Sequence, residues 1–165
     1  MRPRCALHIL RSQIREPSVT IRLRPHHLLC MLTFAGKGYS PEFIANFERI
    51  IDRIASGNQT VEITFAPDDI CAPLLADASC HCRNTSVSTR DTLAAESLGQ
   101  LLQQPIETGT HLTLTAATLD RMRHAFQQGT IRKACKGCQW VPLCDGIAAS
   151  NFVDTRLLAS RPPHN

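Results

Sequence analysis

Apolar and polar residues alternate in three short stretches of the chain, and this pattern predicts β-strands. In residues 20–24 the apolar positions are Ile21 and Leu23, and in residues 61–65 every second residue is apolar. A weaker alternation covers residues 111–115. Because successive strand side chains point to opposite faces, each stretch presents one apolar face to a core. The sequence therefore predicts a small sheet.

Apolar residues at helical spacing predict about four α-helices between these strands. Pro25 fits the first turn of the first helix, and Ser40 with Pro41 forms the typical start of the second. Thr115 or Thr118 caps the helix that ends near Gly129. The first and second helices are expected over residues 26–35 and 41–56. Another is expected over residues 91–102, and a weaker one over residues 147–158.

The length of 165 residues and the hydrophobic content of 43% suit one domain with a real core. Residues 1–19 lack periodicity, contain two prolines and are rich in arginine, so we expect a flexible extension. The predicted organisation is this extension, a single α+β cysteine-rich domain at residues 20–159 and a tail at residues 160–165. The fold class is α+β, with cysteine-bearing loops around one metal or cluster site.

The positive charge of the chain is concentrated at its N-terminal end. The formal net charge is +4, but residues 1–24 contain six arginines and a single acidic residue, which leaves the remainder at −1. A body without a basic excess does not favour nucleic acid as a partner. No apolar run is long enough to span a bilayer or to form a secretory signal, so we expect a cytoplasmic protein.

Three cysteines near the C-terminal end carry the strongest chemical signal. Cys135, Cys138 and Cys144 follow a C-x2-C-x5-C spacing in a segment rich in lysine, glycine, glutamine and proline. A C-x2-C pair turns the backbone so that both sulfurs face one centre, and the third thiol closes over it. In a reducing compartment such a spacing favours metal ligation over disulfides. Three sulfurs leave a tetrahedral centre incomplete, so a fourth ligand must come from elsewhere.

Several upstream residues compete to be the fourth ligand. Cys71 is our first expectation, because it follows a strand and the Asp68-Asp69 turn, which forms a rigid platform. Cys82 is the next choice, and Cys80 points to the opposite side if that stretch is extended.

A second set of candidate ligands lies near the start of the first helix. Cys30 shares a helix face with His26 and His27, since residues three or four apart are neighbours on a helix. Cys30 and His27 therefore join the candidate metal ligands, either at the main centre or at a second site. Ordinary core packing with a histidine bonded to a carbonyl explains the same residues equally well.

The spacing favours an iron–sulfur cluster, preferably of the 4Fe–4S type, over zinc. Zinc sites usually join two short chelating pairs, whereas a close triplet with one remote cysteine is typical of clusters. Trp140 lies within the motif and can shield a cluster from water. We therefore expect an iron–sulfur protein, either structural or passing electrons to a redox partner protein. The alternatives are a zinc-binding interaction module and a thiol-redox enzyme or sensor. No recognised catalytic signature is present, so no reaction follows.

Several segments together resemble domain-of-unknown-function family number 1284, a family of bacterial and archaeal proteins suspected of binding iron–sulfur. The matching segments are residues 21–30, 36–40, 68–71, 81–84, 90–91 and 135–144. The resemblance extends over residues 21–146. It implies candidate ligands at Cys30, Cys71, Cys82, Cys135, Cys138 and Cys144, and it leaves Cys5 and Cys80 outside the family pattern.

Overall fold

The computed structural model describes residues 20–57 and 59–157. Its strands are β1 (Ile21–Leu23), β2 (Gln59–Ile63) and β3 (His111–Leu114). Its α-helices in the described parts of the chain are α1 (Pro25–Cys30), α2 (Pro41–Ala55), α3 (Thr85–Leu102), α4 (Ala116–Gln127) and α5 (Val141–Ala149). The predicted α+β class is confirmed, and the expectations for residues 1–19 and 160–165 lie outside the described residues.

The three strands form one mixed sheet in the order β1-β2-β3. β1 runs parallel to β2, with Ile21 opposite Val61, and β2 runs antiparallel to β3, with Val61 opposite Leu112. A parallel pair needs a long crossover, and α1 and α2 provide it. The alternating residues that predicted the strands are buried, so the sheet presents one apolar face to the core.

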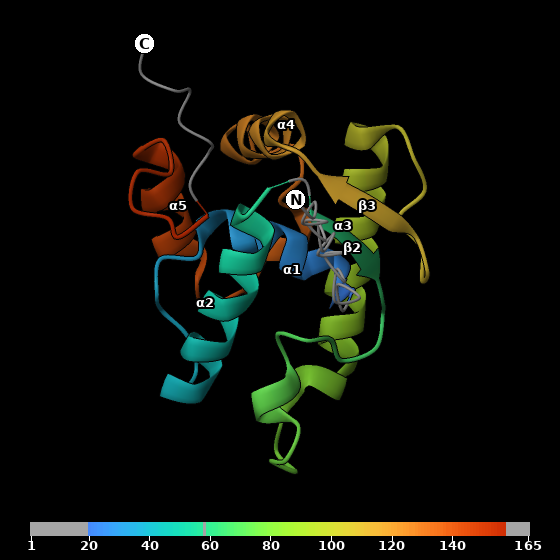
Figure 1. The fold of residues 1–165 in the computed structure, drawn as a ribbon, viewed down its shortest axis with the longest axis vertical. Coiled ribbons are helices and arrows are strands. Elements are labelled where there is room, and N and C mark those ends of the chain that lie inside the picture. Colours follow the sequence, from blue (N-terminus) through green and yellow to red (C-terminus); the bar gives the residue numbers. More distant parts are fainter. Residues whose placement is uncertain (1–19, 58, 158–165) are drawn as a thin grey trace, which may run out of the picture.

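Helix α1 occupies the middle of the molecule, between α2 and α5 on one side and α3 on the other (Figure 1). The start of α2 follows the prediction, because the Ser40 hydroxyl accepts a hydrogen bond from the Phe43 amide at 3.1 Å. The apolar positions of α2 at helical spacing are buried against the core. Short 3₁₀ turns connect several elements, among them η1 (Met31–Thr33), η3 (His81–Arg83) and η4 (Lys133–Cys135).

Three helices differ in their bounds from the sequence prediction. Helix α1 ends at Cys30 rather than near residue 35, and the 3₁₀ turn η1 follows it. Helix α3 begins at Thr85 rather than near Asp91, because Asn84 with extended backbone precedes it and the polar first turn gave no apolar periodicity. Helix α5 covers Val141–Ala149 rather than residues 147–158, since Pro142 fits a first helical turn. The weak helix expected at the end of the chain is therefore wrong in position.

None of the helices in residues 20–57 and 59–157 combines the length and apolar character needed to cross a bilayer.

Replacement of Ile51 by alanine should lower the free energy of unfolding by about 2–5 kcal/mol, because it leaves a cavity in a fully buried position. Urea denaturation measures this loss. Val153, which is 69% exposed, is the control, and its replacement by alanine should change stability by less than about 0.5 kcal/mol. Equal losses in the two variants would contradict the described core.

Candidate metal centre

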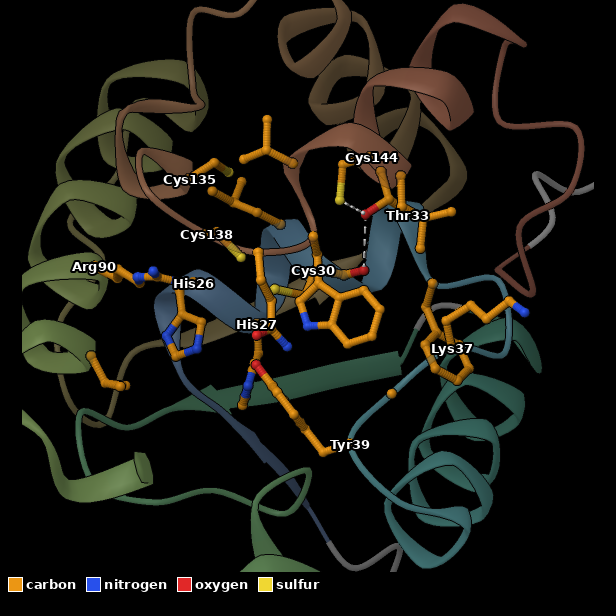
Figure 2. Close-up of a pocket in the computed structure, with 18 of the residues that line it drawn as sticks. His26, His27, Cys30, Thr33, Lys37, Tyr39, Arg90, Cys135, Cys138 and Cys144 are labelled. Carbon is orange, nitrogen blue, oxygen red and sulfur yellow. Dashed lines mark hydrogen bonds between the residues drawn. The ribbon is translucent and has the colours of Figure 1, made fainter. Parts of the chain in front are cut away.

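A cavity of about 460 Å³ lies between α1, the start of α3 and the segment that carries the closely spaced cysteines. Its lining includes the cysteines Cys30, Cys71, Cys82, Cys135, Cys138 and Cys144, and the histidines His26, His27 and His81. Figure 2 shows the thiols of Cys30, Cys135, Cys138 and Cys144 around one space. The fold therefore brings residues from both ends of the domain to one cavity.

The backbone around the C-x2-C pair is folded tightly. Gly137 has a φ of +73°, a left-handed conformation that glycine adopts without steric cost. The Cys138 amide then donates to the Cys135 carbonyl at 3.0 Å. Cys144 lies in the first turn of α5, where its amide donates to the Trp140 carbonyl at 2.9 Å. The expected loop therefore becomes a helix within the motif, which fixes the third thiol on a rigid element.

Cys30 at the end of α1 lies beside these three thiols. Burial raises the pKa of the Cys30 thiol, and the charges of Cys135, Cys144 and Cys138 raise it further. Cys30 also has exposed surface. Burial and exposure are compatible at Cys30, because protein atoms surround the thiol and its exposed surface faces the cavity. Thr33 in η1 also connects this part of the chain to α5, since its hydroxyl lies 3.2 Å from the Cys144 sulfur.

Four thiols line the cavity but do not form a tight group. They belong to Cys30, Cys135, Cys138 and Cys144. Within the described residues, no three of these sulfurs lie within 4.8 Å of one another. Tetrahedral zinc with bonds of about 2.3 Å places its sulfur ligands only about 3.8 Å apart. The arrangement is therefore wider than one zinc ion requires.

A second and tighter group combines His27 of α1 with two residues that follow β2. Ligand atoms of His27, Asp68 and Cys71 all lie within 4.8 Å of one another. The Asp68 carboxylate accepts a hydrogen bond from Nδ1 of His27 at 2.7 Å, and its other oxygen accepts one from the Cys71 amide at 3.1 Å. Cys71, the fourth ligand expected from its place after the strand and the Asp68-Asp69 turn, thus lies next to Asp68 and His27.

Cys82 lies beside this second group and contacts it through the Cys71 thiol. Burial raises the pKa of the Cys82 thiol to about 11, and hydrogen bonds with the thiols of Cys80 and Cys71 also act on it. The Cys82 amide donates to the Cys80 sulfur at 3.4 Å. The stretch is therefore a capped 3₁₀ turn rather than extended, and the expectation that Cys80 and Cys82 point to opposite sides loses its basis.

Arg24 joins the elements that surround both groups. Its guanidinium forms a fully buried ion pair with Asp91 of α3 at 2.6 Å and donates to the Cys82 carbonyl at 2.6 Å. Its backbone amide donates to the Asp68 carboxylate at 2.7 Å. One residue thus fixes two aspartates and one cysteine-bearing turn.

The two aspartates each hold one histidine of α1. Asp91 accepts from Nδ1 of His26 at 2.6 Å, just as Asp68 accepts from His27. Because an ionised carboxylate only accepts hydrogen bonds, Nδ1 of each histidine is the donor, and Nε2 is the ring nitrogen that does not contact the carboxylate. The imidazole rings lie 4.2 Å apart.

Burial and charge set the protonation of this network. Burial lowers the pKa of His26 to about 4, with a further contribution from the charge of His27. Burial alone would raise the pKa of the Asp68 carboxyl, but the charge of His27 and several hydrogen bonds lower it to about 2. At neutral pH the structure thus pairs a neutral His26 with ionised carboxylates.

Aromatic and basic side chains form the rim of the cavity. The Tyr39 ring lies 4.7 Å from His81 and 5.8 Å from Trp140. Arg90 of α3 lies close enough that its charge acts on the thiol of Cys30. Figure 2 shows Arg90 next to His26, whereas Tyr39 lies below His27 in this view.

The sequence analysis missed Arg24 and Asp91 as parts of the site and assigned Asp68 only a turn-forming role. The turn role is confirmed, since Asp68 accepts from the amides of Ile70 and Cys71. A signal was available directly after β1, because Arg24 lies between an apolar strand and the start of an apolar helix, and a buried arginine is usually paired. The sequence offered no indication of which acidic residue that partner is.

These features define a small cysteine-rich α+β protein with a candidate metal site. A family model described as "Protein of unknown function (DUF1284)" matches residues 38–144, more than half of the chain. The chain therefore belongs to the DUF1284 family, as the resemblance implied. The match begins after α1, so the segment of residues 21–30 lies outside the matched range. No curated protein and no solved structure matched the chain.

Replacement of Asp91 by alanine should lower the free energy of unfolding by about 3–5 kcal/mol, because it leaves the buried charge of Arg24 without its partner. Chemical denaturation of the metal-free protein measures this loss. Glu48 provides a matched control, since its pair with Arg156 is exposed and its removal should cost less than about 1 kcal/mol. A small loss in the Asp91 variant would show that Arg24 finds water or another partner.

Acid should destabilise the metal-free protein through His26. Its pKa falls from 6.5 to about 4 on folding, so the unfolded chain binds the proton more tightly. Stability is therefore full above pH 6.5 and falls by up to about 3 kcal/mol as the pH drops towards 4. His27, Asp91 and Arg24 all face the His26 ring.

The free energy of unfolding, measured between pH 4 and pH 7 in wild type and in His26→Asn, tests this prediction. The variant should show a flatter pH dependence. Parallel curves would assign the acid sensitivity to other groups.

Proposed function

We propose that this protein holds an iron–sulfur cluster of the 4Fe–4S type on Cys30, Cys135, Cys138 and Cys144. The observation that carries the proposal is the meeting of four thiols from three elements around one cavity. Thiolates are the usual ligands of such clusters. In this proposal Cys30, one of the candidate ligands from the sequence, takes the place of Cys71, which was the first expectation for the fourth ligand.

The spacing of the sulfurs supports a cluster over a single zinc ion. The iron corners of a cluster lie several ångströms apart, so its cysteine ligands need a wider arrangement than a mononuclear site. The four thiols have this wider arrangement, since no three of them lie within 4.8 Å of one another. The all-thiol donor set suits a cluster, and the lack of a tight triplet among these four sulfurs argues against a single zinc ion.

The surroundings of the thiols suit a redox centre that also stabilises the fold. Thr33 provides a hydrogen-bonding group to the Cys144 sulfur, and Arg132 forms a hydrogen bond with the Cys135 side chain. Hydrogen bonds to cluster sulfurs tune the reduction potential. A cluster here would also join α1 to α5 across the cavity. A partner protein that exchanges single electrons fits this proposal.

The alternative of a reactive thiol enzyme finds no support in the ionisation of the cysteines. Burial raises the pKa of the thiols of Cys30, Cys135 and Cys144. A reactive cysteine needs the opposite, a lowered pKa that populates the thiolate. These thiols therefore suit ligation, in which the metal itself displaces the proton.

Anaerobic purification tests the cluster directly. The wild-type protein should be brown and contain four iron and four sulfide ions per chain, with broad thiolate-to-iron absorption in visible light. Cys30→Ser and Cys138→Ser should lose most of the iron and the absorption. Cys80 does not line the cavity, so Cys80→Ser is the matched control and should keep both.

A colourless wild-type protein with one zinc ion bound by the same four cysteines would overturn the cluster. Full iron content in Cys30→Ser together with loss in Cys71→Ser would instead restore Cys71 as the fourth ligand.

A further inference from the structure

The cavity contains a second set of soft ligands that the proposed cluster does not use. His27, Cys71 and Cys82 all line the cavity, and their exposed fractions are 9%, 3% and 3%. Ligand atoms of His27 and Cys71 lie within 4.8 Å of each other, and the thiols of Cys71 and Cys82 are hydrogen-bonded. His27 and Cys71 are therefore close enough to share one tetrahedral ion, whereas the Cys82 sulfur is not among the ligand atoms that all lie within 4.8 Å and would have to turn towards His27 when the ion binds.

Asp68 belongs to this group as the residue that orients the ligands. Its carboxylate already accepts four hydrogen bonds, from Nδ1 of His27 and from the amides of Arg24, Ile70 and Cys71. A carboxylate has about four lone-pair sites, so none remains for a metal. Histidine ligands of metals typically donate their other ring N–H to a carboxylate. Asp68 holds His27 in this manner and also fixes the backbone of Cys71.

We propose that His27, Cys71 and Cys82 form a second metal centre, selective for a zinc-like divalent ion and separate from the four-cysteine cluster. Nε2 of His27 and the two sulfurs supply three ligands, and the fourth position faces the cavity. Thiolate and imidazole donors together suit zinc better than hard cations such as magnesium or calcium. Three protein ligands with one open position are typical of zinc sites that bind a further small ligand.

The position of the site relative to α1 gives it an independent test. His27 and Cys30 lie three residues apart on α1, so one helix carries a ligand of each centre. The remaining ligands come from different segments, Cys71 and Cys82 for the second centre and residues 135–144 for the cluster. Single substitutions outside α1 should therefore remove one metal and keep the other.

Iron, sulfide and zinc contents of anaerobically purified wild type, Cys138→Ser, Cys71→Ser and Cys82→Ser provide the test. The wild type should contain one zinc ion per chain in addition to the cluster. Cys138→Ser should lose iron and keep zinc, whereas Cys71→Ser and Cys82→Ser should keep iron and lose zinc. Asp68→Asn, which keeps the shape of the side chain, should weaken zinc binding by about 10–100-fold. Circular dichroism establishes that each variant is folded.

Cobalt provides a measurement that needs no variant. Wild-type protein freed of zinc and titrated with Co²⁺ should show tetrahedral d–d bands and thiolate charge-transfer absorption, saturating at one equivalent that zinc displaces.

Loss of zinc in Cys138→Ser, or full zinc in Cys71→Ser, would overturn the second centre. A Cys71–Cys82 disulfide in the anaerobically purified wild type, detected by mass spectrometry after alkylation, would also overturn it. A wild-type protein with iron but no zinc would contradict the second centre and leave the cluster intact. A wild-type protein with zinc bound at Cys71 but no iron would contradict only the cluster.

Discussion

The buried ion pair between Arg24 and Asp91 is the constraint on which the site depends. A buried charge costs several kcal/mol of desolvation, and a well-packed apolar pair is often at least as stable. The main effect of this ion pair is to fix the positions of the groups around it rather than to add stability. The Arg24 guanidinium fixes Asp91 and the Cys82 carbonyl, while its backbone amide fixes Asp68. The positions of both histidines and of one cysteine-bearing turn therefore follow from one arginine at the end of β1.

The cavity combines two kinds of ligand spacing. On one side four thiols stand apart around open space, and on the other His27 and Cys71 lie within 4.8 Å. Because a cluster and a single ion require different ligand separations, the same donor chemistry leads to two different expectations. Position in the sequence does not reveal this difference, since Cys71 and Cys30 are both remote from the C-terminal thiols.

Local patterns predicted the parts of the fold in which sequence neighbours determine structure. The strands and α2 followed from alternation, helical spacing and the Ser40 cap. The start of α3 and the position of α5 were not predicted, because a polar first turn and a helix inside a cysteine motif show no apolar period. The cysteine triplet was recognised from spacing alone. Its approach to Cys30 depends on how α1 and α5 pack, and no local pattern encodes that packing.

The two adjacent histidines of α1 are hydrogen-bonded to two different aspartates. Consecutive helical residues point about 100° apart, so His26 and His27 cannot share one acceptor. Asp91 from α3 holds the first and Asp68 from the turn after β2 holds the second. Cys30, one turn later, faces the thiols of α5 and the C-x2-C turn. These three groups share one helix of six residues. A shift of α1 would therefore disturb every candidate ligand on it, and the hydrogen bonds of His26 with Asp91 and of His27 with Asp68 oppose such a shift.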